Sequence, residues 1–533
     1  MAKNFIDRCF EAVAPVHAVR RSAARAALQF LNSGYGNYGA NQTKKSMRGW
    51  EYYGGSAKED IEDNIDVLRQ RSRDAFMGVP VAASALKTLR TNVVAGGLVP
   101  APQIDGEYLG LTAEQTEMLQ SQIIREFSLW ADTPDCDMDG LGNFYKLQQL
   151  AYLSYLMNGD AFAALPMSDR RGQPYSLRVR VLEADRVCSP NLYDRLEPCE
   201  VNGYSVYRIV QGVETNEAGQ VVAYWVCNRH PLADTAMLGT GLSWARVEAR
   251  GEQSGRRNIV HVITRERAGQ LRGVPILAPV LESLKQLGRY TDAEINAAVI
   301  SSMFTVFVQS DSASNDRPFG EMLPEDMLVD AEDHGSIELG SGAIVALNPG
   351  ENVAFADPKH PNSGYDKFTD AMIRQIGSAL EIPPEVVNKQ FSTSYSAARG
   401  ALNEFWRSCE VQRDDFVDSF CQPIYEEWLA EAVARGRIHA PGFFQDPAIR
   451  KAYSGCTWPG PARTALNPVQ EVSAATKRVE AGFSTAQEET AQMTGGNYNR
   501  NIRQRVAEAK RKREVDEAAQ PPASAGTGGE GNA

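Results

Sequence analysis

The chain has 533 residues, of which 43% are hydrophobic, 8% aromatic and 23% charged. This composition is that of a folded globular protein rather than a disordered one, and the length exceeds the roughly 100–200 residues of one domain. The net charge of −12 argues against a surface that binds nucleic acid tightly through many phosphate contacts, because such surfaces are basic. A moderate negative charge also simply keeps a large protein soluble, so charge alone assigns no function.

The cysteines are scattered and include no CxxC pair, which predicts neither a zinc ribbon nor a disulfide framework. We expect reduced, mostly buried thiols at Cys9, Cys136, Cys188, Cys199, Cys227, Cys409, Cys421 and Cys456. No secretory signal pattern opens the chain, and the stretch nearest to a membrane span, residues 295–308, is too short to cross a bilayer. These features predict a protein without membrane association, in a reducing compartment.

Residues 1–50 carry eight Lys or Arg against two acidic residues, and their pattern is poor. We interpret them as a basic flexible arm, which could touch DNA or another acidic surface or be merely a mobile terminus. Helical spacing then runs from Ile61 to about Val94, where Gly96-Gly97 ends the second of two helices. Thr112 and Gln115 form a capping box for the next helix, and a further helix covers about residues 143–157.

Between residues 160 and 265 the apolar period becomes two, as at Leu177, Val179 and Val181 and again over residues 221–227. This pattern predicts a β-rich segment. Helical spacing returns over residues 275–300, and a strand is expected at 303–309. A loop-and-strand excursion rich in Asp, Glu, Gly and Pro follows over about residues 310–358.

The chain then predicts a helix over residues 362–380 that ends at Pro383-Pro384, followed by a polar link at 385–395. A long helical pattern extends to Gly436, and Pro423 inside it should kink the helix. Three more helices are expected, from Asn467 to Gly482, from Thr485, and over about 498–514. Residues 520–533 have the composition of a disordered tail.

The sequence lacks the residue spacings that chemistry on DNA needs. There is no GxxxxGK[ST] loop for a nucleotide, no HExxH, no GxSxG, and the histidines lie far apart. The acidic cluster over residues 321–333 is better explained as a solvated loop than as a metal site. We therefore expect no enzyme, and we name no catalytic, cofactor-binding or metal-binding residue.

Residues 362–407 resemble the lambda-type family of tailed-bacteriophage portal proteins. Gly364 and Tyr365 open a helix, a turn follows it at 377–385, and Tyr395, Ser396 and Arg399 begin a long helix. Further similar segments lie at 71–73, 92–98, 347–351 and 480–485, so the resemblance spans roughly residues 50–515. Two positions depart from the family's pattern: Ala95 stands where glycine is usual, and Pro383-Pro384 stiffens the turn.

The resemblance implies an α+β portal fold with a mixed α/β wing, a two-helix stem, a small β-containing clip, a long kinked helix and a helical crown. The expected boundaries are an arm at 1–50, wing at 51–270, first stem helix and strand at 271–309, clip at 310–360, second stem helix at 361–383, tunnel loop at 384–396, kinked helix and return to the wing at 397–466, crown at 467–515 and tail at 516–533. Residues 384–396 could instead be an ordinary surface loop.

The family implies a dodecameric ring at one capsid vertex, a homo-oligomer that is the channel for packaging and ejecting double-stranded DNA. Expected partners are the terminase large subunit, a head-tail adaptor, and the major capsid and scaffold proteins, in the virion and, during assembly, in the host cytoplasm. A mostly acidic bore would suit sliding, because each neutralised phosphate adds affinity that holds DNA in place.

Lys389 and Gln390 are our candidates for transient contact with DNA phosphates in such a channel. Lys285, Arg289 and Arg374 are further candidates, although charges on helices are more often simply solvated. Two other functions stay open. Another virion structural protein, such as a capsid protein or protease-scaffold, would form shells rather than rings, and a DNA-packaging enzyme would need a phosphate-binding loop or clustered acidic metal ligands.

Overall fold

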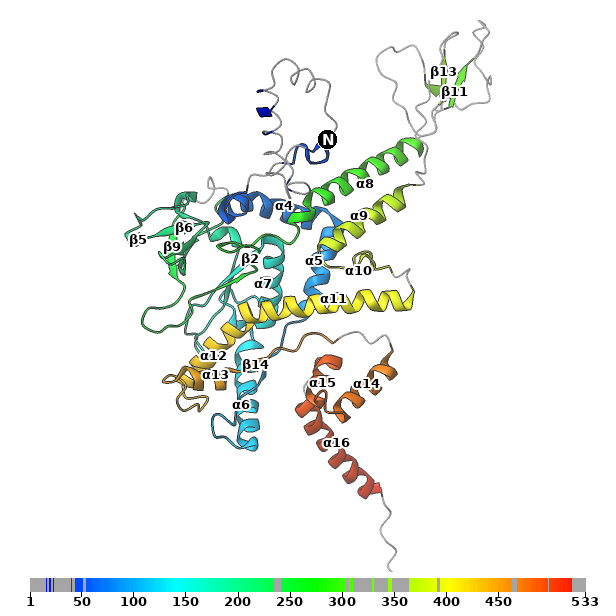
Figure 1. Cartoon of the computed structure of the whole chain (residues 1–533). Coiled ribbons are helices and arrows are strands. Elements are labelled where there is room, and N and C mark those ends of the chain that lie inside the picture. The colour runs from blue at the N-terminus through cyan, green and yellow to red at the C-terminus, as the bar shows by residue number, and fades with distance from the viewer. Residues whose placement is uncertain are drawn as a thin grey trace, which may run out of the picture. The chain divides into compact units, whose positions relative to one another are not determined.

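The computed structural model describes residues 44–50, 54–233, 241–302, 364–390, 394–462, 467–496 and 498–519, three short strands between 306 and 347, and a few single residues near the N-terminus. Most of the predicted arm, most of the predicted clip and the tail from residue 520 lie outside this set. The chain divides into two compact units, Met1–Ser56 and Ala57–Ala533. The second unit mixes α-helices with small β-sheets (Figure 1), in agreement with the predicted mixture of helices and strands.

The main hydrophobic core lies among helices from both halves of the second unit. These are α4 (Ile65–Gly78), α5 (Pro80–Val93), α6 (Ala113–Ala131), α7 (Phe144–Asn158) and α12 (Gln422–Ala434). Phe127 of α6 is their common centre, since its ring packs against Phe144 of α7 and against Trp428 of α12 at 5.8 and 4.9 Å between centroids. Aromatic pairs of this kind anchor α12 to helices nearly 300 residues earlier.

Two local signals in this region behave as predicted. The Thr112 side chain accepts from the Gln115 amide, and the Gln115 side chain accepts from the Thr112 amide, so the capping box that starts α6 is confirmed. Gly97, beyond the end of α5, has φ +115°, and a Cβ there would lie 2.3 Å from Cβ of Tyr145. Glycine therefore allows both the turn and the close approach of α7.

The β-rich segment forms small antiparallel sheets rather than one large sheet. One sheet has the order β10-β2-β3 and contains β2 (Asp160–Ala164), β3 (Arg180–Leu182) and β10 (Ile259–Ile263). A second has the order β6-β7-β8-β9 and contains β6 (Arg208–Val210), β7 (Val213–Thr215), β8 (Val221–Cys227) and β9 (Trp244–Glu248). A hairpin, β4 (Cys199–Val201) with β5 (Tyr204–Val206), and the pair β1 (Ala101–Pro102) with β14 (Cys456–Thr457) complete it.

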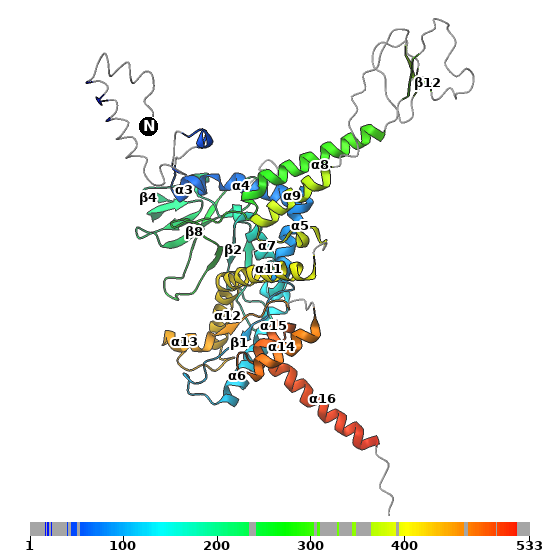
Figure 2. The same ribbon diagram turned by 45° about the vertical axis from the view of Figure 1, so that its right-hand side comes forward.

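Two long helices flank the predicted clip, α8 (Leu281–Ser302) and α9 (Tyr365–Ala379), and they run side by side (Figures 1 and 2). Between them, β13 (Ile344–Leu347) pairs in parallel with β11 (Val306–Gln309) and with β12 (Leu328–Val329). The predicted order of helix, strands and helix is thus present in the described part of this region. The rest of the clip prediction falls outside it.

After α9 come the short helix α10 (Pro384–Asn388) and the long helix α11 (Tyr395–Phe416). A π-helical turn, Val417–Cys421, joins α11 to α12, and the chain changes direction there (Figure 1). The sequence placed the kink at Pro423, whereas the departure from α-helix begins six residues earlier. Pro423 has no N–H for the carbonyl of Ser419, and the wider π turn ends immediately before this gap in the hydrogen bonds.

The C-terminal part of the described chain is helical. α13 (Pro447–Ser454) precedes β14, and α14 (Pro468–Glu480), α15 (Ala486–Thr494) and α16 (Tyr498–Ala519) follow. The capping box at Thr485 and Glu488 is confirmed. α16 continues five residues beyond the predicted end, through good helix formers such as Glu517 and Ala518. No helix among the residues described has the length and apolar character needed to span a bilayer.

Candidate nucleic-acid interface

The candidate interface is built on the α8–α9 pair. Leu284 and Leu287 of α8, and Ile373 and Ile376 of α9, are buried and fix both helices to the main core. Further along, the ring of Tyr290 stacks on Tyr365 at 5.5 Å and meets the edge of Phe368 at 4.9 Å. These contacts fix which face of each helix is buried, and therefore which side chains point to solvent.

Lys285 and Arg289 lie one turn apart on the exposed face of α8, and Arg374 is exposed on α9. None of the three forms an ion pair with a described residue. Lys367 of α9 and Arg407 of α11 are equally exposed and unpaired, and the sequence analysis did not name them. Like charges one turn apart slightly destabilise a helix, so this surface keeps cations that the fold does not use.

The predicted polar link is partly helical rather than a simple loop. A Cβ at Gly377 would lie 2.5 Å from the Ile382 carbonyl oxygen, and the Ile382 amide donates to the Gly377 carbonyl at 2.8 Å, so the chain turns sharply after α9. Pro384 then starts α10, which is tied to α5 by a 3.0 Å hydrogen bond from Ser84 Oγ to the Val387 carbonyl. Sequence reasoning missed this helix because a single turn has little periodicity to detect.

Lys389 ends α10 in the left-handed region, with φ 56°, and the Gln390 amide donates to the Glu385 carbonyl at 3.0 Å. Both side chains are exposed at the last described residues before 394. Lys389 forms no ion pair within the described set. A conformation that costs energy for a lysine therefore presents a free cation on a turn held from both sides by α9 and α5.

The residues of the family-like motif lie at the starts of two helices. Gly364 is the N-cap of α9, and Tyr365 contacts α8 through Tyr290 and a 3.4 Å hydrogen bond to Thr291. Ser396 and Arg399 are exposed in the first turn of α11. The side chain of Tyr395 lies outside what the structure describes. The motif thus marks two helix starts, and only Tyr365 is seen to pack against another element.

Sequence reasoning missed a buried ion-pair network in which Arg272 and Asp160 are fully buried. Arg272 Nε donates to Asp160 Oδ2 at 2.5 Å, and its other nitrogens donate to the carbonyls of Val187 and Ala184. Arg69 of α4 lies 3.6 Å from Asp160 Oδ1 and 3.4 Å from Asp185 Oδ1. The network joins α4 to the sheets, and its members are isolated charges in the sequence with no spacing signal.

The charges of this network shift the pKa values of its members. Asp160 is fully buried, yet Arg272 and Arg69 hold the pKa of its carboxyl well below the usual range against the opposing effect of burial. His261, also buried, stacks on Phe162 at 4.2 Å. Burial lowers the pKa of His261 even though Asp160 lies close to it. Asp160 is therefore ionised, and His261 neutral, at physiological pH.

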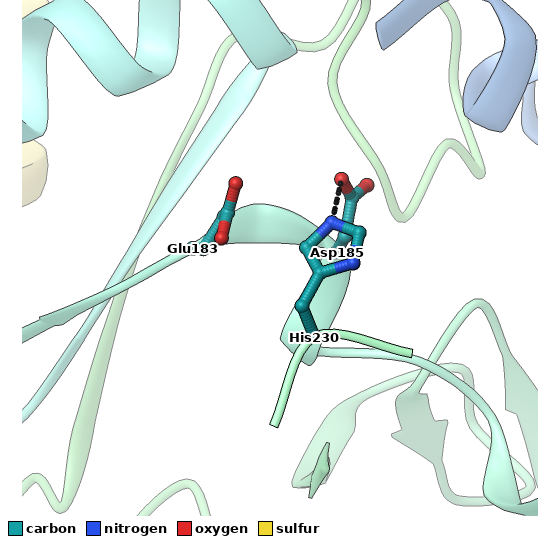
Figure 3. A group of neighbouring side chains, drawn as sticks. All are labelled: Glu183, Asp185 and His230. Atoms are coloured by element: carbon teal, nitrogen blue, oxygen red, sulfur yellow. Dashed lines mark hydrogen bonds and ion pairs between the residues drawn. The ribbon is translucent and has the colours of Figure 1, made fainter. Parts of the chain in front are cut away.

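Glu183, Asp185 and His230 bring three potential metal ligands within 4.8 Å of one another. Figure 3 shows the His230 ring bonded to Asp185, with Glu183 to one side. However, Arg73 forms ion pairs with both carboxylates, and Arg69 forms one with Asp185. These arginines already supply the positive charge that a metal would bring, so we interpret the cluster as an extension of the ion-pair network.

The described thiols match the predicted pattern. Cys136, Cys188, Cys227, Cys409 and Cys421 are buried and free. Burial raises the pKa of Cys136 and of Cys409 to about 12 and that of Cys188 to about 11. A thiol with so high a pKa is almost wholly protonated at neutral pH and is a poor nucleophile.

Comparison with known proteins identifies the family. Residues 43–413 match the family described as phage portal protein, lambda family. Portal protein B of Escherichia phage lambda is 22% identical over 495 residues, covering 90% of this chain and 89% of that protein. The portal protein of Escherichia phage N15 is 23% identical over 487 residues, with 88% of each chain covered.

Among solved structures, a chain from the neck of a native gene transfer agent particle, computed with C12 symmetry, is 14% identical. The match covers 81% of this chain and 92% of that one, with a TM-score of 0.39, which is too low for us to compare the folds. The sequence match supplies the identification. Because the family match extends over well more than half of its length, this chain belongs to the lambda family of phage portal proteins.

Proposed function

We propose that this chain assembles into a closed ring of about twelve copies at one vertex of a phage capsid, and that double-stranded DNA enters and leaves through its axial channel. The observation that carries this proposal is the family match over residues 43–413. The arrangement of the described elements supports it, because two long paired helices flank the segment that the family would use as its clip.

In this proposal the elements take the following roles. α8 and α9 are the stem, residues 310–360 the clip, residues 384–396 the tunnel loop and residues 467–515 the crown, while residues 51–270 and 397–466 form the wing. α10 shortens the proposed tunnel loop to the turn after Asn388. The anchoring of α10 on α5 would hold Lys389 and Gln390 at the edge of the channel.

The protein's own contribution to DNA movement is electrostatic. Each exposed cation that meets a phosphate releases counterions and adds affinity, whereas the chain as a whole has a net charge of −12. Lys285, Arg289, Arg374 and Lys389 would therefore give a small number of weak contacts in a mainly acidic bore. Such contacts guide a duplex without holding it in place.

The partners follow from the same proposal. The terminase large subunit would dock on the clip during packaging, and a head-tail adaptor would take its place afterwards. The wing would meet the major capsid and scaffold proteins. The chain itself would perform no chemistry, since the motor belongs to the terminase.

Native mass measurement and end-on electron micrographs of the purified chain test the proposal together. We expect one species near twelve times the monomer mass, with rotational symmetry and an open central hole. Closed shells, or compact particles of any size without a hole, would contradict it and favour another virion structural role.

A further inference from the structure

The C-terminal half of α16 is a strongly basic helix without a partner. Residues 508–516 are exposed on every side, and the four consecutive cations from Lys510 to Arg513 form no ion pair with any described residue. Figures 1 and 2 both show this end of α16 as a rod with nothing packed against it. A free helical end with adjacent like charges is only marginally stable in water, so a partner of opposite charge would stabilise it.

A complementary surface lies on α11. Val411 is 58% exposed on the side of this helix opposite to the core. Asp414, Asp415 and Asp418 are exposed beside it, and none of them is paired with a cation in the described part of the chain. Burial and the nearby carboxylates of Asp418 and Glu410 raise the pKa of Asp414. The excess negative charge of this stripe is therefore uncompensated.

The two surfaces match in spacing as well as in charge. On α16, Val506 is 51% exposed and is followed by Lys510 and Arg513 at i+4 and i+7. On α11, Val411 is followed by Asp415 and Asp418 at the same intervals. Residues at i, i+4 and i+7 share one face of a helix. Two such faces laid side by side in parallel bring valine against valine and each cation against an aspartate.

We propose that the C-terminal half of α16 from one copy of this chain packs along the Val411–Asp418 stripe of α11 in another copy. The inference rests on the self-assembly part of the proposed function, and it adds the residues through which copies interlock.

The partner is another copy rather than the same chain because α16 is already anchored elsewhere. Arg503 forms an ion pair with Glu117 of α6 and donates to Ser121 Oγ at 3.1 Å, which fixes the N-terminal half of the helix beside α6. Beyond this point residues 508–516 remain exposed, so α16 does not reach its own α11. A groove of 1410 Å³ between α6, α11 and the C-terminal helices, which Asp414 lines, leaves room beside the stripe.

Disulfide trapping between two different single variants tests the contact directly. Protein carrying Val411→Cys is co-assembled with protein carrying Val506→Cys, oxidised and run on a non-reducing gel. We expect a linked dimer from the mixture, because only facing residues bring their Cα atoms within the roughly 4.4–6.8 Å that a disulfide spans. Gln504→Cys, on the opposite face of α16, replaces Val506→Cys in the matched control and should give no dimer above the wild-type background.

Charge exchange separates this contact from binding to nucleic acid. The pair Asp415→Lys with Asp418→Lys, and the pair Lys510→Glu with Arg513→Glu, should each lower the linked fraction about fivefold. Combining the two pairs should restore it. If reversing α16 instead lowers DNA binding, and the combined variant restores no linkage, the helix binds nucleic acid and the proposal is wrong.

The remaining outcomes are also decisive. Rings that form normally without any linked dimer from the Val411→Cys and Val506→Cys mixture overturn the contact and leave the proposed function intact. Failure to form rings under any condition overturns the proposed function and this inference with it.

Discussion

The contacts of Arg272 with Asp160 show why the most important buried charges could not be read from the sequence. The two residues are 112 positions apart, and each is an isolated charge in a β-rich segment. Only the fold brings them together with Arg69. The exposed candidates Lys285, Arg289, Arg374 and Lys389, by contrast, could be named from the sequence, because exposure follows from helical spacing and turn chemistry.

Replacing Asp160 by Asn should destabilise the protein strongly. Removing one partner of a buried pair leaves an uncompensated charge, at a cost of about 3–5 kcal/mol. Asp139→Asn is the matched control, since Asp139 forms only an exposed pair with Arg180 at 3.1 Å and should cost less than about 1 kcal/mol. Denaturant unfolding measures both, and equal effects of the two substitutions would show that the network contributes little.

The protein should lose stability as the pH falls below about 6.5. Burial lowers the folded-state pKa of His261 from its ordinary 6.5, so below that pH the unfolded chain binds the proton more readily. The lowered pKa of Asp160 adds a second loss only as the pH falls through and below 3.8. His261→Gln should therefore flatten the unfolding free energy between pH 6.5 and 5, by up to about 1.4 kcal/mol per pH unit.

His439→Gln, which changes an exposed histidine, is the control for this pH experiment. It should leave the slope of the wild-type protein unchanged. A His261→Gln variant that keeps the wild-type slope would contradict the assignment of the acid loss to this buried ring.

The exposed cations of α8, α9 and α10 should set the salt dependence of DNA binding. Changing Lys285, Arg289, Arg374 and Lys389 together to Gln should weaken binding at low salt. It should also reduce the slope of log affinity against log salt, by up to about 0.9 for each phosphate that the variant no longer neutralises. Lys146→Gln, on α7, should change neither quantity. An unchanged slope in the fourfold variant would place the DNA-binding cations elsewhere.

At the scale of single elements, the sequence predicted what local chemistry controls. The capping boxes at Thr112 and Thr485 and the stop at Gly97 all appear in the structure, because each depends on residues within a few positions. The π turn before Pro423 and the one-turn helix α10 were not predicted. Both depend on packing against distant helices such as α5 and α7.

Two glycines in the paired helices should respond to the same substitution in opposite ways. Gly377→Ala would place a Cβ 2.5 Å from the Ile382 carbonyl oxygen and should destabilise the turn that leads to α10. Gly288→Ala meets no atom within 4 Å inside α8 and should stabilise the protein by up to about 1 kcal/mol. Thermal unfolding of both variants measures this, and stabilisation by Gly377→Ala would rule out the tight turn.

At the scale of the whole molecule, the sequence predicted the mixed α and β composition and the order of helix, strands and helix around residues 310–360. It did not predict how the small sheets order their strands, since strand pairing joins residues far apart in the chain. It also did not predict the joining of α12 to α6 and α7 through Phe127. Those aromatic contacts link segments whose separation exceeds any local signal.

A cryo-electron reconstruction of the assembled chain tests the central claim most directly. We expect a ring whose bore is lined by α8 and α9, with Lys285, Arg289 and Arg374 facing the axis and the turn at Lys389 at the edge of the channel. A ring with these helices on its outer surface, or an assembly with no axial channel, would contradict the account.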